Sequence, residues 1–487
     1  MFSPNQFKFG KQFFITHAEV GQSAWHFWKK YEIDGRYDLY CHPELQVVSV
    51  ETQNSRLVGL GRFFDPNSTK ASDFEILYDI GQTAVGFAEL ESFLARLGGR
   101  WVLIARLGNA TRIYHDATGL KPVFYCGELD KGLSVASQPA LLAAMGAAEL
   151  DDELRQQYDA CAPQASWPLY AIPYQGVKQL LPNHTLDLQT GTSSRYWPKE
   201  DVQFHSIDVL SSAMADMLTN MIEAVTNRRE CVMSLTGGYD SRLLLACSSR
   251  MMNQIEFFTI NSPYTKHYDI SIPKKIARKK GLRYVVIDED SNDRYRDILG
   301  QNVGGMYRDD SISKATSFAA YVGDRFHLTG MTSELNRCYY YKNGRHPAAL
   351  TAAALSRRAR FADNPIAKRG FAKWLDEAPS HLNINLLDLF YWEHRLGVWG
   401  SCGLTFREAI IEQIPPMNCR AFMQLGLSSD VMHRKKPYEL LRSIIRQRDP
   451  QLLAYPFNRS WRDALAQTWR LPQRAMNRVK RHMSIGV

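Results

Sequence analysis

Residues 209–288 alternate between helix-like and strand-like segments, and this alternation constrains the fold more than any other feature of the chain. The expected order is helix 209–228, strand 231–235, a Gly-rich turn, helix 241–251, strand 255–261, helix 270–281 and strand 283–288. Strands that are joined through helices pair in parallel, with the helices packed on the faces of the sheet. We therefore predict a doubly wound parallel sheet, followed by a mainly helical region with one further strand at 326–330.

The first 195 residues have a different pattern, which predicts mainly β-strands. Short apolar runs at 100–108, 111–116 and 122–126 are bounded by Gly, Asn, Asp and Pro at hairpin-like spacing. A chain of 487 residues with 45% hydrophobic residues has room for two large cores. We predict an α/β protein with three parts: an N-terminal β-rich α+β sandwich over 1–195, a parallel-sheet domain with a helical extension over 205–455, and a basic tail over 456–487.

Charge and cysteine content exclude several classes of protein. The net charge is +9, and residues 459–487 hold seven Lys or Arg against one acidic residue, a net +6, so the rest of the chain is near neutral. This distribution does not indicate a general nucleic-acid-binding protein. The eight cysteines form no CxxC pair, which favours reduced, mostly buried thiols. No signal-peptide pattern or long apolar stretch is present, so a cytoplasmic protein is expected.

The segment 234–241, Ser-Leu-Thr-Gly-Gly-Tyr-Asp-Ser, carries the clearest chemical signal. Adjacent glycines let the backbone approach a ligand, while hydroxyls and the N–H groups of the next helix suit a phosphate. The loop lacks the Lys of a Walker motif and the third Gly of a dinucleotide fingerprint. Asp240 would repel a bare phosphate, which suggests a bridging Mg2+. The candidate nucleotide-binding residues here are Ser234, Thr236, Gly237, Gly238, Asp240 and Ser241. A tight strand–helix turn with Ser capping is the alternative.

This string resembles the SGGxDS pyrophosphate loop of N-type ATP pyrophosphatases, and in detail the synthetase domain of the asparagine synthetase family. Later stretches that resemble this domain, in order, are 256–261, 269–281, 328–334 and 412–418. The stretches 97–126, 176–182 and 195–197 resemble the family's glutaminase-like half. The resemblance covers most of residues 40–455.

The resemblance implies ATP and Mg2+ as cofactors. It implies that Ile260 lies on the strand that receives adenine, that Thr329 and Gly330 contact the nucleotide, and that Asp240 and Glu334 bind Mg2+. It further implies an ATP-dependent carbon–nitrogen ligase that converts a carboxylate to an acyl-adenylate, releases pyrophosphate and passes the acyl group to an amine. Family members that lack an active first half include lactam and macrolactam synthetases.

The chain departs from the family pattern at three places. Phe2 stands where the family has the N-terminal Cys nucleophile, so we expect no glutaminase activity. Met331 replaces a catalytic Glu and cannot accept a proton. Tyr438 stands at the position of an essential Lys, and Lys436, slightly upstream, is the candidate to reach the phosphate; a solvated loop lysine is the alternative.

Glu393, His394 and Arg395 interrupt the apolar segment 389–399. They indicate either a solvated helix face or a cleft, in which Glu393 and Arg395 are catalytic candidates and Arg395 holds a substrate carboxylate. Gly397 and Gly400 would then leave room for the bound molecule.

The sequence thus predicts an amide-forming ligase whose candidate catalytic residues are Asp240, Glu334, Lys436, Glu393 and Arg395. Its expected partners are a small-molecule, peptide or saccharide carboxylate and an amine donor, without nucleic acid. Two alternatives remain: a catalytically degenerate binding protein, and a related enzyme acting on RNA. The basic tail is either a solvated terminus or a contact with an anionic surface, remote from the loop. Oligomeric state is not predicted.

Overall fold

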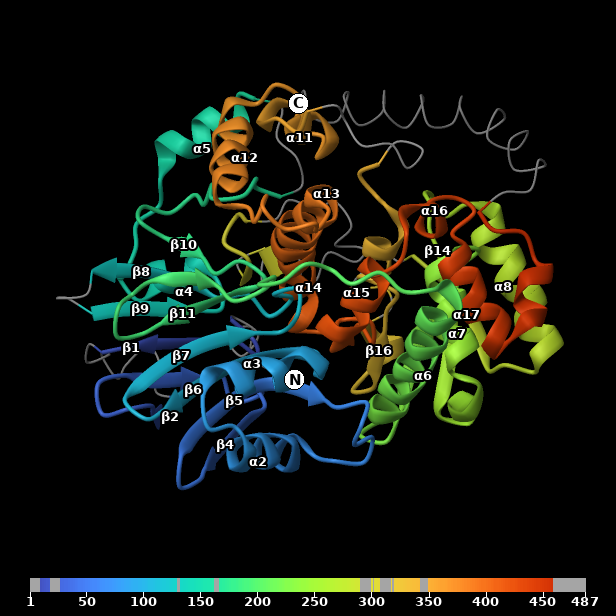
Figure 1. Ribbon diagram of the computed structural model, residues 1–487, viewed down its shortest axis with the longest axis horizontal. Coiled ribbons are helices and arrows are strands. Elements are labelled where there is room, and N and C mark those ends of the chain that lie inside the picture. The colour runs from blue at the N-terminus through green and yellow to red at the C-terminus, as the bar shows by residue number, and fades with distance from the viewer. Residues whose placement is uncertain are drawn as a thin grey trace.

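The computed structural model describes residues 9–17, 27–128, 132–161, 166–289, 299–300, 302–306, 317, 319–341 and 349–458. The tail over 459–487 lies outside the described residues. Figure 1 shows an antiparallel β-sandwich on one side and a parallel sheet flanked by helices on the other. The predicted α/β fold, with a sandwich followed by a parallel-sheet domain, is confirmed.

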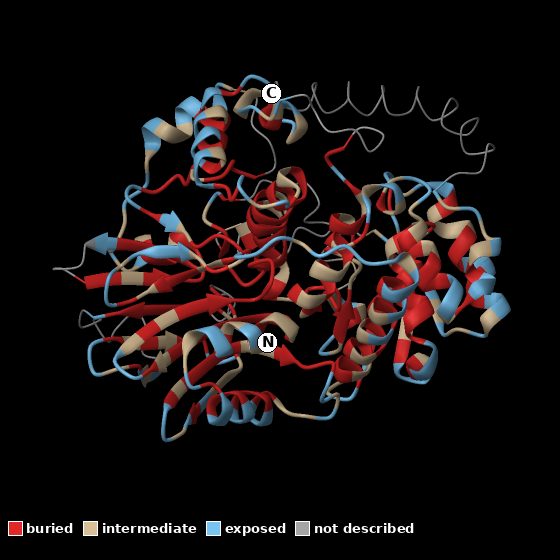
Figure 2. Cartoon of the chain, in the orientation of Figure 1, coloured by how far each residue is buried: buried red, intermediate tan, exposed pale blue. Residues whose placement is uncertain are grey.

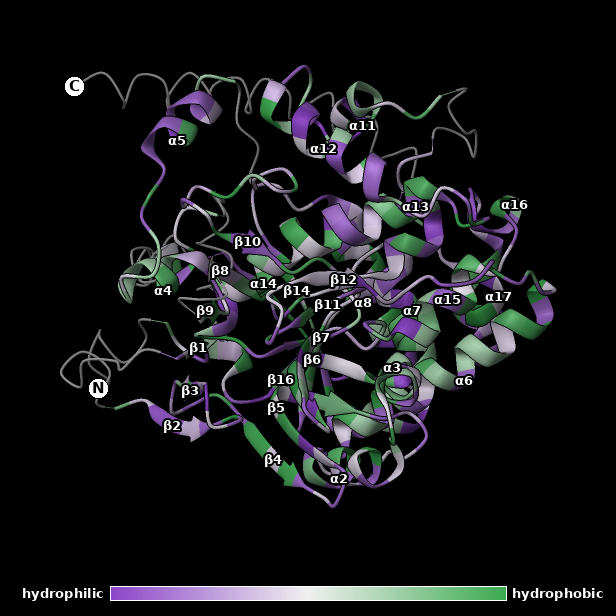
Figure 3. Ribbon diagram, turned by 60° about the vertical axis from the view of Figure 1, so that its left-hand side comes forward, coloured by the Kyte–Doolittle hydropathy of each residue, from purple (hydrophilic) through white to green (hydrophobic). Residues whose placement is uncertain are grey.

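Two six-stranded antiparallel sheets form the N-terminal sandwich. The first has the order β10 (Lys178–Gln179), β8 (Phe124–Glu128), β9 (Gly132–Ala136), β1 (Phe13–Thr16), β3 (Asp38–Cys41), β2 (Lys29–Glu32). The second has the order β12 (Ser193–Arg195), β11 (His184–Asp187), β7 (Ala110–His115), β6 (Gly98–Leu107), β5 (Ser55–Phe64), β4 (Val47–Glu51). The edge strand β2 is largely exposed and hydrophilic (Figure 3), which opposes pairing with other chains.

Alternation along the strands fills the space between the sheets. In β1, Phe13 and Ile15 belong to the core between the sheets, whereas Phe14 faces the opposite way, toward a second cluster shared with the C-terminal helices. Helices α2 (Asp73–Thr83) and α3 (Phe87–Arg96) cover the outer face of the second sheet. The strands of the sandwich are mostly buried in Figure 2.

The C-terminal unit is built on a five-stranded parallel sheet in the order β15 (Tyr284–Asp288), β14 (Ile255–Asn261), β13 (Cys231–Ser234), β16 (Phe326–Leu328), β17 (Gln413–Ile414). The helices α6 (Ile207–Thr226), α7 (Tyr239–Cys247), α8 (His267–Lys280) and α17 (Glu439–Arg448) pack against it. The predicted helix 241–251 is divided, because α7 ends at Cys247 and a 3-10 helix, η2 (Ser249–Gln254), follows.

The remaining helical elements pack around these sheets. They are α4 (Pro139–Ala144), α5 (Asp152–Asp159), η3 (Ser333–Arg337), α11 (Ala352–Arg358), α12 (Pro365–Glu377), α13 (Leu386–Phe390), η4 (Tyr391–Gly400), α14 (Ser401–Glu408), α15 (Arg420–Leu427), α16 (Val431–Arg434) and η5 (Pro450–Ala454). The segment η4 is a π-helix and packs against the sandwich, where Trp392 Nε1 donates to the Ala117 carbonyl at 2.7 Å. No helix among the described residues is both long and apolar enough to cross a membrane.

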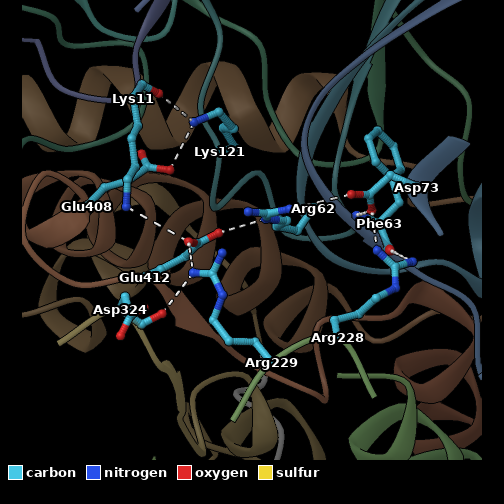
Figure 4. A network of polar contacts seen from close by, with 10 residues as sticks. All are labelled: Lys11, Arg62, Phe63, Asp73, Lys121, Arg228, Arg229, Asp324, Glu408 and Glu412. Carbon is cyan, nitrogen blue, oxygen red and sulfur yellow. Dashed lines mark hydrogen bonds and ion pairs between the residues drawn. The ribbon is translucent and has the colours of Figure 1, made fainter. Parts of the chain in front are cut away.

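Ion pairs across the contact between the units form the network in Figure 4. Buried Lys121 donates to Glu408 Oε1 at 2.9 Å and to the Lys11 carbonyl at 3.0 Å. Glu412 accepts from Arg62 at 2.9 Å and from Arg229 at 3.3 Å. The sandwich and the parallel-sheet unit therefore share a buried polar contact in addition to their apolar one.

Candidate active site

The Gly-rich loop lies where the order of the parallel strands reverses direction. Its strand, β13, pairs with β14 on one side and with β16 on the other. In open α/β sheets, the crevice at the carboxyl ends of two such diverging connections is the usual ligand site. The segment after β16, which holds the predicted contacts Thr329 and Gly330, leaves the same edge of the sheet. The topology thus brings two separate predicted segments together.

Side chains of this chain hold the backbone amides of the loop. Thr236 N donates to Ser241 Oγ at 3.0 Å, Gly237 N to Asp269 Oδ1 at 3.0 Å, and Gly238 N to Thr236 Oγ1 at 3.2 Å. These bonds fix the turn from β13 into α7, whose N-cap is Gly238. A phosphate that used these amides would replace the present acceptors.

Close backbone packing explains the glycines here. A Cβ on Gly237 would lie 2.9 Å from Tyr268 Cδ2, and a Cβ on Gly330 would lie 2.7 Å from Asp240 Cβ. Gly330 is therefore required for the segment after β16 to reach the loop. The predicted contact Ser234 ends β13, and the Ile260 carbonyl on β14 accepts from Thr265 Oγ1 at 2.8 Å.

Asp240 and Glu334 converge on one guanidinium. Arg337 Nη2 lies 2.9 Å from Asp240 Oδ2 and 3.1 Å from Glu334 Oε1. Ser333 Oγ donates to the other oxygen of Asp240, and the Tyr391 hydroxyl donates to Glu334 Oε2 at 2.8 Å. The two predicted metal ligands are thus brought together, and the sequence interpretation missed Ser333, Arg337 and Tyr391.

Burial shifts the pKa of two groups in this cluster, Asp240 and Tyr391. Burial raises the pKa of Asp240 above its ordinary value, although Arg337 and the Ser333 hydrogen bond oppose the shift. Burial, followed by the charge of Glu334, raises the pKa of Tyr391 well above 10.0, so its hydroxyl remains a donor. The cluster carries two carboxylates against one guanidinium.

Left-handed backbone conformations gather around the cluster. Thr332 has φ +80° and Cys338 has φ +51°, one at each end of the short helix η3 that carries Ser333, Glu334 and Arg337. Tyr438, beside Arg337, has φ +63°. Non-glycine residues rarely adopt this region, and such residues concentrate at functional sites.

The donor set fits Mg2+. Magnesium is usually held by one or two carboxylates together with substrate phosphates, rather than by a full protein cage. Asp240 and Glu334 supply two carboxylates beside the loop. Within the described residues, no group of three or more His, Cys, Asp or Glu side chains is arranged to bind a metal without a substrate.

Lys436 and Met331 have different surroundings. Lys436 is exposed and takes part in no ion pair found in the described part of the chain, while the neighbouring Pro437 carbonyl accepts from Tyr239 OH at 3.2 Å. Lys436 is therefore the chain neighbour of a residue that contacts α7. Met331 packs among apolar residues of the helical region.

Glu393 is buried between the two units. Its carboxylate accepts from Arg195 at 2.5 and 2.9 Å, from Asn183 at 2.9 Å and from Trp374 at 2.8 Å. The solvated-face interpretation is wrong for Glu393 and for its neighbour His394, because both are buried. These contacts favour a structural role for Glu393 over the predicted catalytic one.

Arg395 is half-buried, with its guanidinium carbon 3.6 Å from the Trp399 ring centroid. Arg395 follows Tyr391 by four residues in η4. The predicted space beside Gly397 is absent, because a Cβ there would lie 2.6 Å from Pro182 Cδ. Gly397 therefore accommodates the sandwich rather than a ligand.

The C-terminal segment 452–458 also contacts the loop; we call it the strap. Buried Arg242 donates to the carbonyls of Gly237, Leu452, Tyr455 and Pro456. The Phe457 ring stacks on Tyr239 with centroids 3.8 Å apart, and Asn458 N donates to the Gly237 carbonyl at 3.2 Å. The predicted tail over 456–487 thus begins with three residues of the strap, whereas its basic part lies outside the described residues.

No protein-family profile matches the chain, and no curated protein matches it. The solved structures that it is similar to include the glutamine phosphoribosylpyrophosphate amidotransferase of B. subtilis complexed with ADP and GMP, at 12% identity and a TM-score of 0.26, over 67% of this chain and 70% of that one. Another is the NMN synthetase of Francisella tularensis, at 13% identity and 0.22, over 39% and 93%.

A third is the glutamine-dependent NAD+ synthetase of Acinetobacter baumannii in complex with ADP, at 14% identity and a TM-score of 0.21, over 46% of this chain and 52% of that one. Likenesses this weak carry no argument about function.

Proposed function

We propose that this protein is an ATP-dependent ligase that adenylates a substrate carboxylate, releases pyrophosphate and transfers the acyl group to an amine. The observation that carries the proposal is the convergence of the Gly-rich loop with the Asp240–Glu334 pair at the reversal point of the parallel sheet. A phosphate-suited loop beside two carboxylates is the arrangement needed for a nucleotide with its magnesium.

The residues divide into three roles. The loop amides and the hydroxyls of Thr236 and Ser241 would contact the phosphates that leave as pyrophosphate, once the present internal bonds are exchanged. Asp240 and Glu334 would hold Mg2+, which supplies positive charge to the leaving pyrophosphate. Arg395, in the same segment η4 as Tyr391, is the candidate for holding the substrate carboxylate before its attack on the α-phosphate.

The products of ATP turnover test this proposal. Purified protein is incubated with ATP, Mg2+, an amine and a panel of carboxylic acids, and nucleotides are separated by chromatography. The proposal expects AMP and pyrophosphate in equal amounts, dependent on one acid. Formation of ADP and phosphate would contradict it, because that pair comes from attack at the γ-phosphate instead.

A second candidate is a binding protein that has lost catalysis. The observation that favours it is that the amides of Thr236, Gly237 and Gly238 are already occupied by acceptors of the chain. Calorimetry with ATP and Mg2+ distinguishes the two candidates. A binding protein without a nucleotide site would give no ATP binding, whereas the proposed ligase binds ATP even without its acid.

A further inference from the structure

Asp240 and Glu334 are both paired with Arg337, and the proposed function has so far given this arginine no role. Arg337 contacts Asp240 and Glu334 through Nη2, and its side chain is 13% exposed. Neither carboxylate is paired with a lysine among the ion pairs of the described residues. Lys436, the predicted phosphate contact, is exposed and unpaired in that same set.

The guanidinium of Arg337 has hydrogen-bonding capacity to spare. Its Nε is buried and has no hydrogen-bond partner in the described residues, and the buried Thr332 Oγ1 on the same segment has none either. Buried polar groups without partners are uncommon and call for a ligand, an ion or a water. A planar guanidinium with free N–H groups is well suited to phosphate oxygens, which it can bind in pairs.

Neighbouring residues hold the Arg337 side chain in position. Its guanidinium carbon lies 5.6 Å from the centroid of the Tyr438 ring, and Tyr438 packs edge-on against Tyr239 in the first turn of α7. The short helix η3 that carries Arg337 is bounded by two left-handed residues, Thr332 and Cys338. Arg337 is thus held at the start of α7, beside the loop.

The charges of the cluster give Arg337 two opposite effects. With Asp240 and Glu334 it forms a group of net charge −1, which repels phosphate and attracts a divalent cation. When Mg2+ joins, the group becomes net +1, and the spare donors of Arg337 then face a site that attracts phosphate. The same guanidinium competes with the metal for the carboxylates and adds to the metal's attraction for the phosphates.

We propose that Arg337 is the catalytic cation that contacts the leaving pyrophosphate, in the place that the sequence suggested for Lys436. The inference rests on the proposed adenylation. It assigns the phosphate-facing charge to η3, next to the metal ligand Glu334, instead of to the exposed segment before α17.

Calorimetry with two separate probes tests the inference: Mn2+ alone, and inorganic pyrophosphate at saturating Mn2+. In Arg337→Gln we expect pyrophosphate affinity to fall roughly 10- to 100-fold, the loss of a charge-assisted contact. Affinity for Mn2+ alone should rise severalfold, because the competing guanidinium is gone. Arg337→Lys should retain part of the pyrophosphate affinity, and Lys436→Gln should lose less than Arg337→Gln.

The matched control is Arg325→Gln. Arg325 pairs with Glu256 at 2.6 Å and precedes β16, at the end of the strand opposite the loop, so both affinities should stay unchanged. Thermal melting of each variant reports on folding. A parallel fall of both affinities in Arg337→Gln would show that Arg337 only positions Asp240, and unchanged pyrophosphate affinity would also overturn the inference. Absence of pyrophosphate binding by the wild-type protein would instead overturn the proposed function, and the inference with it.

Discussion

At the residue scale, one methyl group added at Gly330 tests whether Asp240 belongs to the active site. A Cβ there would lie 2.7 Å from Asp240 Cβ, so Gly330→Ala must shift Asp240 or the segment after β16. A displacement of a reacting or binding group by about 1 Å can lower a rate by on the order of 100-fold. We expect Gly330→Ala to reduce ATP–pyrophosphate exchange by about 10- to 100-fold and, because overpacking costs about 1 to 3 kcal/mol, also to lower the melting temperature.

Gly300→Ala provides the comparison, because a Cβ on Gly300 meets nothing within 4 Å. Exchange in this variant should match the wild type. Equal exchange rates in Gly330→Ala and Gly300→Ala would contradict the placement of Asp240 in the active site.

The sequence could predict Asp240 but not its partners. Asp240 belongs to the segment 234–241, whose adjacent residues together indicate a phosphate-binding loop. Arg337 and Tyr391 act on the same cluster from segments about 100 and 150 residues later, and a lone Arg or Tyr has no local pattern that marks it. The only signal available was the i, i+3 spacing of Glu334 and Arg337, which is common on solvated helices.

At the element scale, the strap couples the C-terminus to the loop. The Phe457 ring stacks on the Tyr239 ring, and the Arg242 guanidinium carbon lies 3.6 Å from the centroid of the Phe457 ring. Phe457→Ala removes both ring contacts, which together are worth about 1 to 2 kcal/mol. We expect weaker ATP binding in this variant, measured by calorimetry, with circular dichroism unchanged.

Truncation after Asn458 is the companion experiment, because it removes the basic tail and leaves the strap in place. Nucleotide affinity should then stay near that of the wild type. If Phe457→Ala binds ATP as tightly as the wild type, the strap contributes stability alone.

The elements that carry strong periodicity were predictable, and those that depend on distant partners were not. Strand β14 begins and ends where the alternation with helices places it. By contrast, the segment 389–399 is apolar enough to indicate a helix, yet nothing in it shows that Glu393 meets Arg195 from the sandwich. That pairing depends on how two units pack, about 200 residues apart in the chain.

At the scale of the whole molecule, three glutamates lie at the contact between the two units; Glu393 and Glu408 are buried, and Glu412 is partly buried. Burial alone would raise the pKa of each glutamate, but nearby cations outweigh this effect. Glu393 lies beside Arg195, and Glu408 lies beside Arg100 and Lys121. Glu412 lies beside Lys11 and Arg62. Each pKa therefore lies below the ordinary 4.5. A carboxylate with a depressed folded-state pKa stabilises the fold above its unfolded pKa.

We therefore expect the free energy of unfolding to be fully supported by these glutamates above about pH 4.5 and to fall as pH decreases below it, through the folded-state values. Urea unfolding at several pH values between 6 and 3 measures this. Glu408→Gln should be less stable at pH 6, because Lys121 is left buried without its partner, and should lose less stability on acidification. An identical acid dependence in both proteins would exclude Glu408 from the effect.

The claim that the Gly-rich loop supports adenylation is tested most directly by ATP–pyrophosphate exchange. Labelled pyrophosphate is incubated with ATP, Mg2+, the protein and the acid that supports AMP release, without an amine. We predict label in ATP for the wild type and none above background for Asp240→Asn, which has lost one carboxylate charge beside Arg337. Undiminished exchange by Asp240→Asn, with melting unchanged, would contradict the account.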